Sequence, residues 1–131
     1  MTRNPTAAPS QRQLRVGEEI RHSLAEIFAR EALHDPALQG VSLTFTEVRM
    51  SPDLRIATVF FLPLGGGDVA LVAKGLGRAA PHLRGLLGRM VRLRNVPQLK
   101  FLADHSFARA EAINQLLRRV AQAQDDAGEG E

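Results

Sequence analysis

Arginine and histidine side chains recur at helical spacing within residues 78–100. Those that a helix would place on one face, at successive spacings of four, seven and three positions, are Arg78, His82, Arg89 and Arg92. Further positive charge comes from Arg84, Arg94 and Lys100. No acidic residue lies between Asp68 and Asp104, so nothing in the stretch neutralises this charge. Because guanidinium groups bind phosphate oxygens in pairs, the stretch is a candidate nucleic-acid interface; an ordinary solvated helix face is the alternative.

The aromatic residues argue against base stacking as the mode of binding. The chain has no Trp or Tyr, and its six Phe side chains mostly fall on core-type positions. Proteins that bind single strands by stacking need exposed aromatic rings. We therefore expect contacts to the phosphates and 2′-hydroxyl groups of a structured RNA, made by arginine side chains and by backbone amides at a helix terminus.

The remaining polar residues do not predict enzyme or metal chemistry. The chain has no cysteine, and its four histidines are scattered without the spacing of a metal site. The run Gly65 to Gly67 before Asp68 lacks the Lys and Ser/Thr of a phosphate-binding P-loop. Asp53 and Asp104 are better explained as turn and helix-cap residues. We expect no catalytic residues, no metal and no cofactor, and therefore not an enzyme.

Length and composition fit one globular domain. The chain has 131 residues, of which 44% are hydrophobic and 24% charged, and its formal net charge is +3. We expect residues 1–12 to be a flexible arm, 13–121 the RNA-binding domain and 122–131 a disordered acidic tail. No apolar run reaches the roughly 20 residues that span a bilayer, and the first residues lack the apolar core of a signal peptide, which predicts a cytoplasmic protein with no membrane partner.

Hydrophobic periodicity predicts a helix and then a hairpin in the first half of the chain. Residues 13–32 carry apolar side chains at helical spacing, and Pro36 lies just beyond the end of that pattern. Strands are predicted over 41–50, with a bulge where the alternation shifts, and over 54–62. A proline-containing turn joins them into an antiparallel hairpin, and residues 63–67 are predicted to be a loop.

The second half predicts a helix-kink-helix element, a third strand and an extra C-terminal helix. Asp68 is predicted to cap the first of these helices, and Pro81 to kink it rather than end it, because helical spacing resumes at once. Residues 99–103 alternate as a strand, and residues 107–120 form the last helix. The order predicts an α+β fold in which helices pack on one face of a three-stranded sheet.

The apolar stripe of the last predicted helix allows two interpretations. Its members include Leu116, Leu117 and Val120. Packing of this stripe on the sheet of its own domain is favoured, and it predicts a monomer. The alternative is that the stripe pairs with another chain, which would make the protein an interaction adaptor that dimerises through its C-terminal helix.

Three short stretches resemble the ribosome-binding factor A family of bacterial small-subunit assembly factors. The most specific runs from Arg92 to Ser106 and resembles the family signature RLRxxPxLxFxxDxS. Supporting stretches are Val48 to Leu54 and Leu86 to Gly88. The resemblance covers roughly residues 12–120.

The resemblance implies a type II KH-like domain that binds precursor 16S rRNA on the free small (30S) ribosomal subunit. It also implies no enzymatic activity, a role in late maturation that includes 5′-end processing, a role in cold adaptation, and release with a maturation GTPase. The family has an Ala-x-Gly kink where this chain has Ala79-Ala80-Pro81; proline removes a backbone N–H there, so the flanking arginines are the better candidates. The predicted RNA-binding residues are Arg78, Ala79, Ala80, His82, Arg84, Arg89, Arg92, Arg94 and Lys100.

Overall fold

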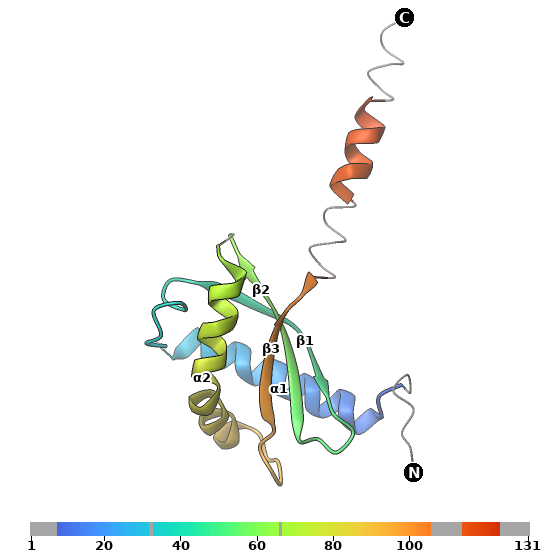
Figure 1. Cartoon of the computed structure of the whole chain (residues 1–131). Helices are drawn as coiled ribbons and strands as arrows, with labels where there is room; N and C mark the ends of the chain where they lie inside the picture. Colours follow the sequence, from blue (N-terminus) through green and yellow to red (C-terminus); the bar gives the residue numbers. More distant parts are fainter. Residues whose placement is uncertain (1–7, 32, 66, 106–113, 124–131) are drawn as a thin grey trace, which may run out of the picture.

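The computed structural model describes residues 8–31, 33–65, 67–105 and 114–123 (Figure 1). Residues 8–105 contain, in chain order, the elements α1 (Gln11–Arg30), β1 (Ser42–Met50), β2 (Ile56–Leu64), α2 (Val69–Met90) and β3 (Gln98–Ala103) among the described positions. Helix α1 packs mainly on β1, and α2 packs mainly on β3. The predicted α+β fold with a three-stranded sheet is confirmed.

A capping box starts α1 two residues before the predicted position. The Ser10 hydroxyl accepts a hydrogen bond from the N–H of Gln13 (3.1 Å), and the Gln13 side-chain carbonyl accepts one from the N–H of Ser10 (2.8 Å). These bonds satisfy N–H groups that a first helical turn leaves without partners. Gln13 Nε2 also donates to the carbonyl of Met50 (3.0 Å), which ties the start of α1 to the end of β1.

Strands β1 and β2 form the predicted antiparallel hairpin, including its bulge. The register shifts directly after Phe45, so Thr46 is the extra residue of a β-bulge. Strand β2 runs two residues later at each end than the alternation predicted, through Pro63. Proline is tolerated there because β3 pairs only with the earlier part of β2, which leaves this end with a single neighbouring strand.

Strand β3 pairs with β2 in parallel, which gives the sheet order β1-β2-β3. The pairing places Ala57 beside Leu99 and Val59 beside Phe101. Parallel neighbours need a long crossover connection, and α2 supplies it. As a result, the loop before β3 and the start of β3 lie close to the turn between β1 and β2 (Figure 1).

Helix α2 begins where Asp68 was predicted to cap it. Asp68 Oδ1 accepts hydrogen bonds from the N–H groups of Ala70 (3.0 Å) and Leu71 (3.3 Å). The helix then continues through Pro81 as one element to Met90. The proline therefore does not divide it into two helices, and a bend of the axis at Pro81 stays a prediction.

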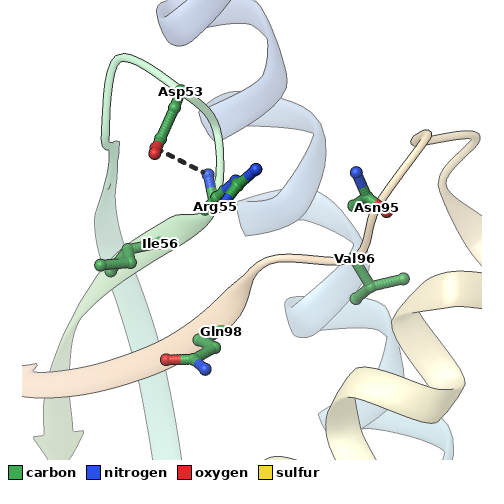
Figure 2. A pocket seen from close by; sticks show the side chains of 6 residues that line it. All are labelled: Asp53, Arg55, Ile56, Asn95, Val96 and Gln98. Atoms are coloured by element: carbon green, nitrogen blue, oxygen red, sulfur yellow. Dashed lines mark hydrogen bonds between the residues drawn. The ribbon is translucent and has the colours of Figure 1, made fainter.

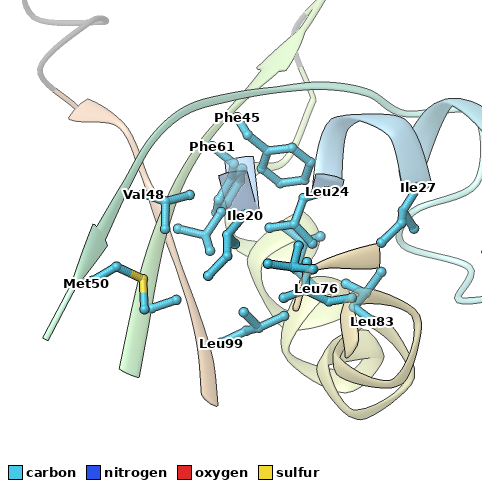
Figure 3. Close-up of a cluster of buried hydrophobic side chains, with 14 of the residues drawn as sticks. Ile20, Leu24, Ile27, Phe45, Val48, Met50, Phe61, Leu76, Leu83 and Leu99 are labelled. Atoms are coloured by element: carbon cyan, nitrogen blue, oxygen red, sulfur yellow. The ribbon is translucent and has the colours of Figure 1, made fainter. Parts of the chain in front are cut away.

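The core lies between the two helices and one face of the sheet (Figure 3). Side chains alternate along each strand, so every second residue contributes to this layer. Burial of each large apolar side chain contributes about 1.5–3 kcal/mol to stability. The core side chains with no exposed area are Ile20, Leu24, Ala57, Val59, Phe61, Leu76, Leu83 and Leu87.

Gly17 allows α1 to lie directly on the backbone of β1. A Cβ atom at this position would lie 2.6 Å from the carbonyl oxygen of Val48. No relaxed structure tolerates so short a contact with a backbone atom. The absence of a side chain at Gly17 therefore sets the distance between helix and sheet.

Residues 114–123 form a helix whose apolar side chains are exposed. Leu116, Leu117 and Val120 are 58%, 60% and 49% exposed. The described part of the C-terminal helix does not pack on the sheet, so the interpretation favoured from the sequence is wrong for these residues. Periodicity defines an apolar stripe but not the surface that covers it. The predicted start of this helix at Phe107, most of the predicted arm and most of the acidic tail lie outside the described residues.

Candidate nucleic-acid interface

The end of α2 and the loop that follows it carry exposed arginines. Arg89 lies in the last turn of α2, and Arg92 and Arg94 lie in the loop before β3. All three side chains are exposed, and none of them has an ion-pair partner in the part of the chain that the structure describes. We call these three residues the arginine segment. Their guanidinium groups are available to bind phosphate.

Arg92 does not share a helical face with His82 and Arg89, contrary to the prediction from spacing. Helix α2 ends at Met90, and Val91 adopts an extended conformation (φ −115°, ψ 128°). The Val91 side chain is buried, at 7% exposed. Because the chain turns to bury Val91 in the core, Arg92 projects from the loop, whereas His82 and Arg89 remain exposed on α2.

Arg78 is paired with an acid from a distant part of the chain. Its Nε and Nη2 atoms donate to Oδ2 and Oδ1 of Asp35, at 2.7 and 2.9 Å. The hydrogen bonds from Arg78, with a further one from the N–H of Ala37, lower the pKa of Asp35 to about 2. The Asp35 carboxylate therefore stays ionised and offsets the charge of Arg78. Arg78 contributes less positive potential to an RNA surface than the sequence predicted.

Arg84 holds the loop before β3 in place. Its Nε and Nη2 atoms donate to the carbonyl oxygens of Pro97 and Val96, both at 3.0 Å. The side chain is half-buried, and Pro97 is fully buried beneath the loop. Two of the five guanidinium N–H groups are thus engaged with the loop backbone. The residue fixes the segment that presents Arg92 and Arg94.

Three further residues predicted to contact RNA, Ala79, Ala80 and Lys100, do not lie beside the arginine segment on one surface. Ala79 and Ala80 are partly buried and pack against the core. Lys100 is exposed on β3. Its neighbours Leu99 and Phe101 face the helices, so Lys100 projects from the opposite face of the sheet. The predicted set is therefore divided between two surfaces of the domain.

A groove that the sequence analysis missed opens beside the loop that carries Arg92 and Arg94 (Figure 2). It lies between the β1–β2 turn and the loop before β3, and its volume is about 470 Å³. Arg55 and Asn95 lie on opposite sides of it in Figure 2. Arg55 was missed because it stands alone in the sequence, 23 positions before Arg78, the first arginine of the cationic stretch. The lining residues are Asp53, Arg55, Ile56, Asn95, Val96 and Gln98.

Phe60 departs from the expectation that the phenylalanines serve the core. Its ring is half-buried and lies beneath the guanidinium group of Arg49, with 5.0 Å between that group and the ring centroid. Arg49 also donates to both carboxylate oxygens of Glu47, at 3.0 and 3.2 Å. A cation–π contact of this kind covers the ring. Phe60 is thus not an open platform for base stacking.

Metal ligands and membrane-spanning elements are absent from the described residues. No group of three or more His, Asp or Glu side chains in residues 8–31, 33–65, 67–105 and 114–123 could hold a metal ion. Within the same ranges, no helix is both long enough and apolar enough to cross a bilayer.

Comparison with known sequences identifies the family. A profile described as ribosome-binding factor A matches residues 12–117. The chain belongs to the ribosome-binding factor A family. The ribosome-binding factor A of Rhodospirillum rubrum is 54% identical over 125 residues, which cover 95% of this chain and 76% of that protein. That of Phenylobacterium zucineum is 56% identical over 114 residues, which cover 87% and 79%. The resemblance noted in the sequence is confirmed.

Structures of ribosome-binding factor A, one solved and one a fitted homology model, share the fold. The crystal structure from Thermus thermophilus superposes with a TM-score of 0.60 at 31% identity, over 70% of this chain and 93% of that one. A homology model of the Thermus thermophilus factor, fitted into a cryo-EM map of its complex with the 30S subunit, has a TM-score of 0.54 at 32% identity. That match covers 68% of this chain and 91% of the fitted one.

Proposed function

We propose that the chain is a non-enzymatic assembly factor that binds the small (30S) ribosomal subunit through 16S rRNA. The observation that carries the proposal is the arginine segment: three exposed guanidinium groups without acidic partners among the described residues, on a domain of the ribosome-binding factor A family. The Thermus thermophilus member fitted into a 30S complex supports the choice of partner. Phosphate contacts of this kind supply a large share of the affinity of a protein for nucleic acid.

The fold suits recognition of RNA by shape. Arg84 fixes the loop that carries two of the three arginines, so little conformational freedom is lost when that loop meets a phosphate backbone. Bidentate contacts from Arg89, Arg92 and Arg94 read the spacing of phosphates rather than the identity of bases. His82, about two turns before Arg89 on α2, extends the surface along the helix.

The finer role follows from the family resemblance. It comprises a type II KH-like domain, help in late maturation including 5′-end processing, adaptation to cold, and release with a maturation GTPase. That the protein acts as a monomer in the cytoplasm is a separate part of the proposal and does not come from the resemblance. In this chain the kink contact of the family would fall on Ala79 and Ala80. Because both pack against the core and Pro81 has no N–H to donate, the arginine segment carries the larger share of binding.

Co-sedimentation with separated ribosomal subunits tests the proposal. The purified chain is mixed with small or large subunits at low and moderate salt, with a bare RNA duplex as competitor. We expect selective sedimentation with the small subunit that survives the competitor. Equal binding to both subunits and to the duplex would reduce the protein to a general basic module, and no binding would refute the proposal.

The alternative is an interaction adaptor that dimerises through the C-terminal helix. The exposure of Leu116, Leu117 and Val120 favours it. Sedimentation equilibrium separates the two functions. Our proposal predicts the monomer mass of 14.3 kDa over a wide concentration range. A mass that rises toward twice that value, and that a Leu117→Glu variant restores to the monomer, would favour the adaptor.

A further inference from the structure

We propose that the groove between the β1–β2 turn and the loop before β3 binds one unpaired nucleotide of the RNA. The inference rests on the proposed function and deepens it, because it adds recognition of a base to recognition of phosphates. It assigns roles to Arg55, Asn95 and Gln98, none of which was predicted from the sequence to contact RNA.

The two walls of the groove are fixed to each other. The N–H of Gln98 donates to the carbonyl of Arg55 at 2.8 Å, which joins the start of β3 to the start of β2. On the other wall, Asp53 Oδ1 accepts hydrogen bonds from the Ser51 hydroxyl (2.7 Å) and from the N–H of Arg55 (3.1 Å). Arg84 donates hydrogen bonds to the carbonyl oxygens of Val96 and Pro97, which fixes the loop before β3. The groove is therefore formed before any ligand arrives, as binding sites generally are.

Three of the six side chains that line the groove are polar and are not engaged elsewhere in the described part of the chain. Arg55, Asn95 and Gln98 are exposed, and in the described part of the chain their side chains make no hydrogen bond. Each amide offers donors and an acceptor side by side, and this pattern pairs with the edge of a nucleobase. The Arg55 guanidinium suits the phosphate of the same nucleotide.

Asp53 limits which ligands fit. Its carboxylate forms hydrogen bonds with Ser51 and with the N–H of Arg55, which lower the pKa of Asp53 and keep it ionised at neutral pH. Its negative charge disfavours an anion beside Asp53, whereas the exposed guanidinium group of Arg55 suits the phosphate. A base amino group, in contrast, can donate to the second carboxylate oxygen. The groove thus offers a guanidinium group for the phosphate and amide and carboxylate groups for the base.

The size of the groove and its position favour a nucleotide that is not paired. A volume of about 470 Å³ lies within the range of pockets that hold one small organic ligand, and a base in a duplex cannot present its pairing edge to it. Asn95 directly follows Arg94 in the chain. An RNA strand with a phosphate at Arg94 would therefore lie beside the groove.

Binding of short RNAs to the full chain tests this inference. The probes are single-stranded homopolymers of A, C, G and U and a duplex of the same length, followed by fluorescence anisotropy. We expect a preference among the single strands. Asn95→Ala and Gln98→Ala should each weaken the preferred strand about five- to hundredfold while the duplex affinity and the salt dependence stay unchanged, because no charge is lost. Arg55→Ala should reduce the salt dependence by about one phosphate equivalent.

Control variants separate this inference from the proposed function. Gln39→Ala removes an exposed amide from the loop between α1 and β1 and should change no affinity. If Arg89→Ala with Arg92→Ala weakens every RNA whereas Asn95→Ala and Gln98→Ala change none, the groove is not a nucleotide site and the proposed function stands. If the chain does not bind small subunits but its preference among single strands still depends on Asn95, the groove is a nucleotide site and the proposed function is wrong.

Discussion

Arg78 donates two hydrogen bonds, of 2.7 and 2.9 Å, to the carboxylate of Asp35, which lies 43 positions earlier in the chain. The pair joins the middle of α2 to the loop between α1 and β1. It also takes one arginine out of a stretch of sequence that contains no acid at all. Part of the cationic surface is therefore neutralised by tertiary structure.

Removal of this ion pair should be visible in the titration of Asp35. The pKa of Asp35 is held at about 2 against an ordinary 3.8, so the pair stabilises the folded state above about pH 4 and this contribution is lost as the pH falls toward 2. In Arg78→Ala we expect the pKa to rise toward 3.8 and remain slightly below it, because the N–H of Ala37 still donates. An NMR titration of the carboxylate measures it, with Arg30→Ala as control. An unchanged value would show that Arg78 is not the cause.

Two glycine substitutions should change stability in opposite directions. Gly17→Ala would place a Cβ 2.6 Å from the Val48 carbonyl oxygen, and the shift of α1 that relieves this contact should cost about 1–3 kcal/mol. Gly77→Ala on α2 has no atom within 4 Å of the new Cβ, so it should stabilise the protein by about 0.5–1 kcal/mol through helix propensity. Chemical denaturation of both variants gives the two signs; equal signs would contradict the close packing of α1 on β1.

Arg84→Ala should loosen the loop before β3. Loss of two hydrogen bonds from a charged donor to the carbonyls of Val96 and Pro97 should cost about 1–3 kcal/mol and speed hydrogen exchange at loop amides such as that of Leu93. Arg15→Ala, which removes an exposed arginine from α1, is the control and should leave both unchanged. If loop exchange in Arg84→Ala matches that of the unmodified protein, the loop is held by other contacts.

The local features of the fold could be predicted from the sequence because they depend on neighbouring residues. Alternation located all three strands, the break in that alternation located the bulge at Thr46, and Asp68 capped α2 as expected. Helix α1 started earlier than predicted because the capping box of Ser10 and Gln13 outweighs the apolar pattern that begins after it.

Features that depend on contacts between distant residues could not be predicted. The parallel pairing of β3 with β2, the approach of Asp35 to Arg78 and the groove between Arg55 and Asn95 each join segments tens of positions apart. Arg92 was assigned to a helical face because spacing alone does not show that Val91 is buried and ends the helix. The prediction that the last helix packs on the sheet was wrong for a similar reason, because periodicity does not show which surface an apolar stripe meets.

The salt dependence of binding to the small subunit tests the central claim most directly. Affinities of the unmodified chain, of Arg89→Ala and Arg92→Ala singly and combined, and of Arg30→Ala as a control are measured across a range of salt concentrations. Each lost phosphate contact should lower the slope of log affinity against log salt by about one phosphate equivalent, so the double variant should lose about two and the control none. An unchanged slope and affinity in the double variant would contradict the assignment of the arginine segment to RNA.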